Sequence, residues 1–86
     1  MPEISRFLGI VIRMYFDDHA PPHFHAAYGA AEARVRILPV GLLDGNMPPR
    51  PLALAIEWAS LHESELLANW RRLRRKQSPI RIAPLE

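Results

Sequence analysis

The chain has 86 residues, of which 49% are hydrophobic and 23% charged, and this composition predicts one globular domain over residues 1–86. It has no cysteine, which excludes disulfide bonds and thiolate metal sites. The first nine residues lack the apolar core of a signal peptide, and no apolar run approaches the roughly 18 residues of a membrane span. We therefore expect a cytoplasmic protein that makes no membrane contact.

The basic residues are almost all arginine, ten of the eleven. Arginine binds phosphate and carboxylate groups through paired N–H donors and stacks on bases, so the bias fits nucleic acid or an acidic protein as a partner. An arginine-rich genome gives small proteins the same bias, and the formal net charge is only +2. Composition by itself leaves both explanations open.

The first half of the chain has the alternation of short β-strands. Residues 4–7 form a candidate short strand, and Ile10–Phe16, rich in β-branched and aromatic residues, forms the clearest one. Residues 17–22 contain a Pro-Pro pair, which predicts a loop. Two further strands are expected at His23–Tyr28 and Ala33–Leu38. Together they predict an antiparallel meander.

Strand parity decides which side chains share a face of this sheet. If Phe24 points into the core, His23 and His25 point to the opposite face. Three arginines of the neighbouring strands would lie on that same face: Arg13, Arg34 and Arg36. The sheet would then combine an apolar face with a face that carries histidine and arginine.

The second half of the chain changes period. Residues 39–49 hold several glycines and prolines, which predicts a connecting loop with little regular structure. Apolar residues then recur at steps of three and four, which predicts one amphipathic helix over Pro51–Gln77, with a break near His62–Ser64 as the alternative. Residues 80–86 allow a short last strand along a sheet edge.

The predicted fold class is therefore α+β. We expect a small antiparallel sheet of three or four strands, with one long C-terminal amphipathic helix on one face.

The stretch Asp17–Gly29, DDHAPPHFHAAYG, holds three of the four histidines, and metal binding is one interpretation of it. His23 and His25, two residues apart on one strand face, can supply two ligands to one ion. A third ligand would come from Asp17, Asp18 or His19. Imidazole and carboxylate together suit a transition metal such as zinc or nickel.

Acid–base catalysis without a metal or other cofactor is the second interpretation. His23 and His25 would act as base and acid on a phosphodiester, as in a metal-independent ribonuclease, with Asp18 orienting one ring. Arg13, Arg34 and Arg36 would hold the phosphate. In the third interpretation the histidines only stabilise the loop through backbone hydrogen bonds. The sequence does not decide between the three.

The C-terminal end of the predicted helix is strongly basic, with five basic residues in Arg71–Lys76. Cations at that end interact favourably with the helix dipole, which is the structural explanation. The functional one is a surface for RNA or for an acidic partner protein, with Arg71, Arg74, Arg75 and Trp70 as its contact residues. His62 is one helical turn from Glu65, so a surface hydrogen bond explains it.

The whole chain resembles a small bacterial family known as a domain of unknown function. The resemblance rests on the opening MPEISRFLGIVIRMYFDDHAPPHFHAAYG, on LALAIEWASLHESELLANW and on IAPL. The residues that match the hallmark motif are Asp17, Asp18, His19, Pro21, Pro22, His23, Phe24 and His25. The family is similar to the DhiT-type toxin of type II toxin–antitoxin systems, whose genes lie beside that of a small DhiA-type antitoxin.

The resemblance implies a toxic activity and a cognate antitoxin as partner, but it supplies no catalytic residues. Combined with the histidine–arginine face, it leads to the hypothesis of a toxin that acts on RNA or on the translation machinery. The rival hypothesis is a small metal-binding or regulatory interaction module without catalysis. The sequence leaves open whether the chain forms a homo-oligomer.

Overall fold

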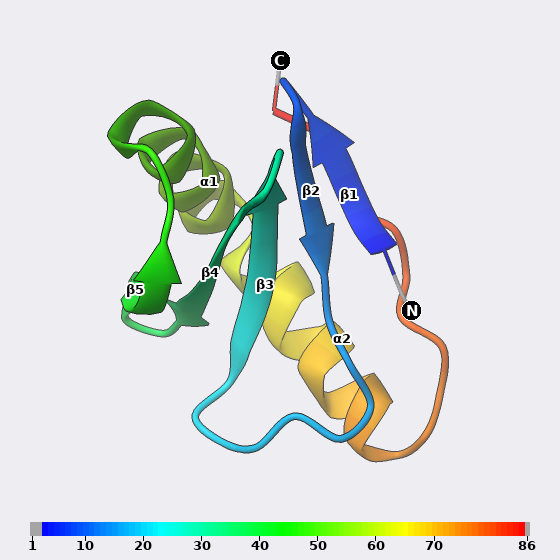
Figure 1. Ribbon diagram of the computed structural model, residues 1–86. Coiled ribbons are helices and arrows are strands. Elements are labelled where there is room, and N and C mark those ends of the chain that lie inside the picture. The colour runs from blue at the N-terminus through cyan, green and yellow to red at the C-terminus, as the bar shows by residue number, and fades with distance from the viewer. Residues whose placement is uncertain (1–2, 86) are drawn as a thin grey trace.

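The computed structural model describes residues 3–85, and its centre is one antiparallel sheet of five strands in sequential order (Figure 1). Each strand pairs with the next along the chain. The strands are β1 (Glu3–Phe7), β2 (Ile10–Arg13), β3 (His23–Tyr28), β4 (Ala31–Ile37) and β5 (Val40–Asn46). The predicted α+β class is confirmed, but the sheet has five strands where three or four were predicted.

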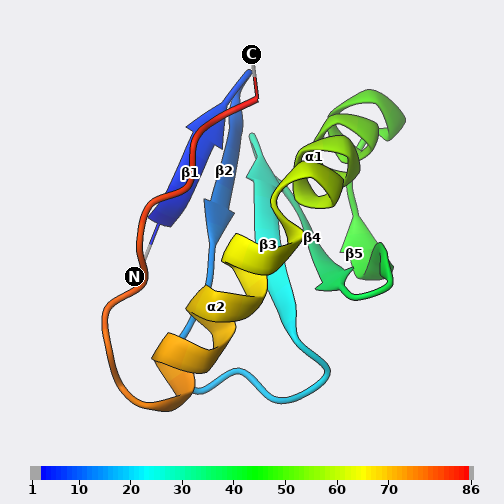
Figure 2. The same ribbon diagram turned by 180° about the vertical axis from the view of Figure 1, so that it is seen from behind.

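Two helices, α1 (Pro49–Leu61) and α2 (Glu63–Arg74), cover one face of this sheet (Figure 2). Apolar side chains of the sheet and of the helices meet between these two layers and form the core. Trp58 of α1 is fully buried there and packs against the rings of Phe7 and Phe24. The larger fully buried apolar side chains are Ile4, Ile10, Ile12, Met14, Phe24, Val35, Ile37, Trp58, Leu66 and Leu73.

The fifth strand lies where the sequence predicted a loop. Residues 40–46 pair with β4, with a bulge between Arg34 and Val35. Gly45, which the sequence placed in the loop, has a positive φ of 103°. A Cβ on it would lie 2.6 Å from the backbone of Ala33. Glycine at this position therefore permits close strand pairing at the bulge. The prediction was wrong because a glycine inside a strand and a glycine inside a loop look alike in the sequence.

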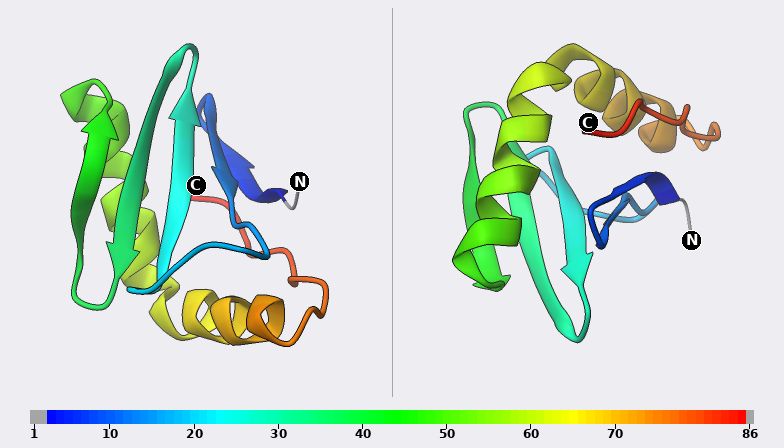
Figure 3. Two further views of the ribbon diagram at one scale, coloured as in Figure 1. Left: turned by 60° about the horizontal axis from the view of Figure 1, so that its bottom comes forward. Right: turned by 90° about the horizontal axis from the view of Figure 1, so that it is seen from above.

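The helical region is divided, as in the alternative interpretation, and the predicted single helix is wrong. His62 ends α1 and begins α2 with a non-helical backbone (φ −124°, ψ 29°). One helix over residues 51–77 would be about 40 Å long at 1.5 Å per residue. The longest extent of the molecule is 33 Å. The sheet is too short to cover such a helix. The break at His62 lets α1 and α2 run in different directions, so that both pack on the sheet (Figure 3).

The tail after α2 runs beside β1 but forms no strand within the described residues, which end at Leu85. One backbone–backbone hydrogen bond joins it to the sheet: the Ile82 N–H donates to the Ile4 carbonyl at 2.8 Å. Side chains of the helices hold the rest. The Asn69 amide both donates to and accepts from the backbone of Ile80 at 2.8 Å, and the Trp58 indole donates to the Ala83 carbonyl.

The N-terminal half follows the prediction more closely. Strand β1 lies at the predicted short strand, and β2 begins at Ile10 as expected, but it ends at Arg13 and leaves Phe16 exposed in the following loop. Within residues 3–85, neither helix is long and apolar enough to cross a membrane.

We predict that Asn69→Leu lowers the free energy of unfolding by about 2 kcal/mol, because the two hydrogen bonds between the buried Asn69 amide and the Ile80 backbone are lost. Leucine has a similar size, so packing changes little. Urea denaturation measures the difference, and Gln77→Ala, at an exposed position, is the control. A loss below about 0.5 kcal/mol for Asn69→Leu would show that the tail is held without this clamp.

An ion cluster also joins the tail to β1. The Glu3 carboxylate accepts hydrogen bonds from Arg6 at 2.8 Å and from Arg81 at 3.2 Å. These donors, Arg6 foremost, lower the pKa of Glu3 from 4.5 to about 2. Because the pKa is lower in the folded chain, the cluster stabilises the fold fully above about pH 4.5, and this contribution is lost as the pH falls toward 2.

We therefore predict that Glu3→Gln lowers the Tm at neutral pH and that the difference from the parent closes between about pH 4.5 and pH 2. In the parent, protonation of Glu3 removes the same interactions that the substitution removes. Thermal unfolding followed by circular dichroism across this range measures both proteins. A Tm difference that stayed constant down to about pH 2 would contradict the prediction.

Candidate functional site

The register of the sheet places arginines on both sides of the two histidines of β3. Arg13 of β2 and Arg34 of β4 are both opposite His25, and Arg36 is opposite His23. Phe24, between the histidines, is fully buried in the core. His23 and His25 therefore lie on the strand face opposite Phe24, as parity predicted, although the His23 ring still reaches Trp70 of α2.

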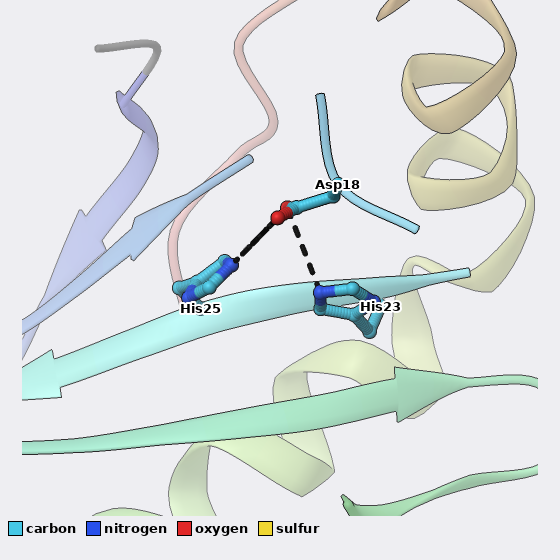
Figure 4. Close-up of side chains that lie close together, drawn as sticks. All are labelled: Asp18, His23 and His25. Carbon is cyan, nitrogen blue, oxygen red and sulfur yellow. Dashed lines mark hydrogen bonds and ion pairs between the residues drawn. The ribbon is translucent and has the colours of Figure 1, made fainter. Parts of the chain in front are cut away.

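The loop after β2 folds back over the start of β3 and brings Asp18 to both histidines (Figure 4). Asp18 Oδ2 lies 3.1 Å from Nε2 of His25 and 3.5 Å from Nε2 of His23. One ligand-type atom from each of the three residues lies within 4.8 Å of the other two. We call this set, Asp18, His23 and His25, the DHH cluster.

His23 is the buried member of the DHH cluster, with a side chain only 1% exposed. Its Nδ1–H donates to the carbonyl of Pro21 at 2.8 Å, which holds the ring in one orientation. The ring also packs against His25 and against Trp70 of α2, at a centroid distance of 5.3 Å in each case. Its Nε2 is buried and has no hydrogen-bond partner in residues 3–85.

His25 lies at the open side of the cluster. Its Nδ1 is 3.3 Å from Glu32 Oε2, and Tyr15 packs edge-on against its ring at 4.6 Å. It also lines an open pocket of about 290 Å³ with Glu32, Ala33, Arg34, Asp44 and Gly45. A molecule in this pocket would reach His25 but not the buried His23.

The three arginines predicted to hold phosphate have different surroundings. Arg34 forms a bidentate ion pair with Asp44 of β5, and the hydrogen bond from Arg34 lowers the pKa of Asp44. The Arg36 guanidinium donates to the carbonyl of Pro39 at 3.0 Å. Both side chains are therefore engaged within the fold. For Arg13, half-buried opposite His25, the structure gives no such side-chain partner in residues 3–85.

His19 does not join the DHH cluster. It is exposed in the loop, and Asp18 takes the place that the sequence offered to Asp17, Asp18 or His19 as third ligand. The structure thus groups Asp18, and not His19, with His23 and His25 as residues that could hold a metal ion. The reason is the loop path, which turns one of two neighbouring side chains inward and leaves the other in solvent.

At the end of α2, Arg71, Arg74 and Arg75 are exposed, whereas Trp70 is only 8% exposed. Trp70 packs on His23, and the Arg74 guanidinium lies over the Trp70 ring at 4.6 Å. Trp70 thus belongs to the core that supports the DHH cluster, with little surface left for a partner. The sequence interpretation of His62 agrees with its 2.6 Å contact to Glu65.

Sequence reasoning missed two residues that contact His25, namely Glu32 and Tyr15. Glu32 has the same parity as Arg34 and Arg36 in β4, and it is opposite Ala27, one step diagonal from His25. Parity alone was therefore sufficient to place Glu32 on the histidine face. In the predicted strand Ile10–Phe16, Tyr15 has the parity of Arg13, so the sequence placed it on the same face but gave it no role.

A comparison with protein-family models matches residues 9–71 to a domain of unknown function, DUF4160. The match covers well over half of the chain. The chain belongs to this family. In this DUF4160 chain the matched region contains every residue of the DHH cluster and most of both helices, but not the tail. The searches of curated proteins and of solved structures found no match.

Proposed function

We propose that this DUF4160 chain is the toxin of a two-protein toxin–antitoxin pair, that the DHH cluster is its active centre, and that RNA is its target. The observation that carries the proposal is the convergence of three ionisable side chains, one of them buried with an unbonded ring nitrogen. The resemblance described above supplies the toxin role, and the cluster supplies a centre for it.

The cost of the cluster to stability supports a functional role. A buried polar atom without a hydrogen bond, such as Nε2 of His23, destabilises a protein by about 1–3 kcal/mol. An apolar side chain at this position would pack against Trp70 without that cost. Local conflicts of this kind are expected at functional sites, where chemistry matters more than stability.

Access and charge support RNA as the target. The open side of the cluster at His25 borders the pocket, and Arg13 is opposite His25 on the neighbouring strand. On the other side, the ring contact from His23 to Trp70 leads to Arg74 and to the exposed arginines at the end of α2. Basic side chains therefore flank the cluster on two sides, which suits a phosphate backbone.

The structure changes the roles expected of the two histidines. His23 is buried and its Nδ1 is engaged with Pro21, so it cannot exchange a proton with a bound substrate. His25 and Asp18 are the members of the cluster that a substrate can approach. A mechanism with His23 and His25 as an acid–base pair therefore does not fit this geometry.

We predict that induced expression of the chain arrests bacterial growth, that co-expression of the protein encoded beside it relieves the arrest, and that His25→Ala or Asp18→Asn abolishes it. Both variants remove a partly exposed member of the cluster and leave the core intact. Growth curves measure the arrest, and immunoblots confirm equal expression. His19→Ala is the matched control, because His19 is in the same loop but outside the cluster.

Arrest by His25→Ala as strong as that of the parent would remove the DHH cluster from the toxin's activity. No arrest by the parent would remove the toxin role itself.

We also propose that the antitoxin contacts the end of α2. Arg71 and Arg75 are exposed there, close to the stacked Arg74, and present positive charge to an acidic partner. The double reversal Arg71→Glu and Arg75→Glu leaves Arg74 on Trp70 undisturbed. We predict that it weakens binding of the neighbouring gene's product at least tenfold.

Isothermal titration calorimetry at low and at physiological salt measures this affinity. The control is Arg50→Glu, a charge reversal at the exposed start of α1. An equal loss of affinity in the control would show that only the overall charge matters and that α2 is not the contact surface.

A further inference from the structure

Three donor atoms of the DHH cluster converge, and no arrangement of protons on neutral imidazole rings satisfies all of them. We propose that Asp18, His23 and His25 bind one divalent first-row transition-metal ion through a carboxylate oxygen and two imidazole nitrogens. The site rests on the geometry and chemistry of the three side chains and is independent of the toxin role.

The hydrogen bond of His23 determines what its other nitrogen can do. A carbonyl oxygen only accepts, so Nδ1 of His23 must carry the proton that it donates to Pro21. In the neutral ring, Nε2 is then a bare lone pair, and it is buried 3.5 Å from a carboxylate oxygen of Asp18. Two acceptors face each other there, and a cation between them turns this repulsion into coordination.

His25 has the same problem in a different form. Its Nδ1 lies 3.3 Å from Glu32 and its Nε2 lies 3.1 Å from Asp18, so both nitrogens face carboxylates. A neutral imidazole has only one N–H to donate. If Nδ1–H donates to Glu32, Nε2 is free to bind a metal beside Asp18. A carboxylate behind a metal-bound histidine is a common supporting arrangement, and it orients the ring.

The spacing of the donor atoms fits a metal ion. Metal–nitrogen and metal–oxygen bonds of about 2.0–2.2 Å place ligand atoms roughly 3.0 Å apart at right angles and roughly 3.4 Å apart at tetrahedral angles. The distances from Asp18 Oδ2 to Nε2 of His25 and of His23 are 3.1 Å and 3.5 Å. The donor atoms of the two rings lie within 4.8 Å of each other, so side-chain rotations that bring the rings together would let one ion bind all three residues.

The donor set indicates the class of metal. Two imidazoles and one carboxylate suit zinc, nickel, cobalt or ferrous iron, whereas calcium and magnesium prefer oxygen ligands. A structural zinc site has four protein ligands in a closed tetrahedron. Three ligands leave at least one position for water or another molecule, and His25 places that side of the site beside the open pocket.

The test is a titration of the full-length chain without a histidine tag, after treatment with a chelator. Zn²⁺ is titrated by calorimetry, and Co²⁺ is added as a spectroscopic probe, because its visible d–d bands report nitrogen ligands and coordination number. We expect about one Zn²⁺ per chain, a higher Tm with the metal, and Co²⁺ bands that Zn²⁺ removes.

The variants separate a cluster site from histidines in general. Asp18→Asn and His25→Ala should each weaken Zn²⁺ binding at least about 100-fold, and Glu32→Gln, which keeps all three ligands, should weaken it about tenfold. His19→Ala and His62→Ala remove histidines outside the cluster and should leave the affinity unchanged. His23 is buried, so His23→Ala can unfold the chain; the partly exposed Asp18 and His25 keep the test independent of folding.

Less than about a tenth of an equivalent of bound Zn²⁺, or equal affinity in His25→Ala and His19→Ala, would overturn the proposal. The titration uses purified protein, so its outcome is separate from growth arrest. Growth arrest without metal binding would reject the metal site and keep the toxin role. Metal binding without growth arrest would reject the toxin role and keep the metal site.

Discussion

The register of β3 between β2 and β4 is the constraint on which the rest of the molecule depends. It places Phe24 in the core, where its ring packs edge-on against Trp58 at 5.7 Å. Because side chains alternate along a strand, burial of Phe24 forces both neighbouring histidines to the other face. A slip of one residue would expose the phenylalanine and bury His25, so packing in the core also determines the position of the functional site.

The site itself is completed by the loop before β3 and by α2. The loop contributes Asp18 and the Pro21 carbonyl, and α2 contributes Trp70, which packs behind His23. The same helix holds the tail through Asn69. A disturbance in α2 would therefore affect both the closure of the fold and the orientation of His23. The division of the helical region at His62 gives α2 the direction that both contacts require.

Stability and function compete at the DHH cluster. Most of the interior is apolar, and the buried Asn69 is bonded to the backbone, whereas Ser5 Oγ, like His23 Nε2, has no hydrogen-bond partner in residues 3–85. His23 is different, because one ring nitrogen is satisfied and the other is directed at a carboxylate. A bound cation would make the same arrangement favourable, since the pair of opposed acceptors becomes a pair of ligands. The feature that is costly for folding is thus the one that suits chemistry.

Local pattern in the sequence was sufficient for the strands with regular alternation and for the face on which His23, His25, Arg13, Arg34 and Arg36 lie, because parity is a property of the strand itself. It also predicted the helical region, since its apolar spacing is local.

Tertiary structure decided the rest. The length of each helix depends on the size of the sheet beneath it. The pairing of β5 depends on the backbone of β4, which comes so close to residue 45 that only glycine fits there. The ion pair of Arg34 depends on Asp44 of β5, which follows ten residues later in the chain. The choice of Asp18 over His19 depends on how the loop folds back onto β3, which no local pattern encodes.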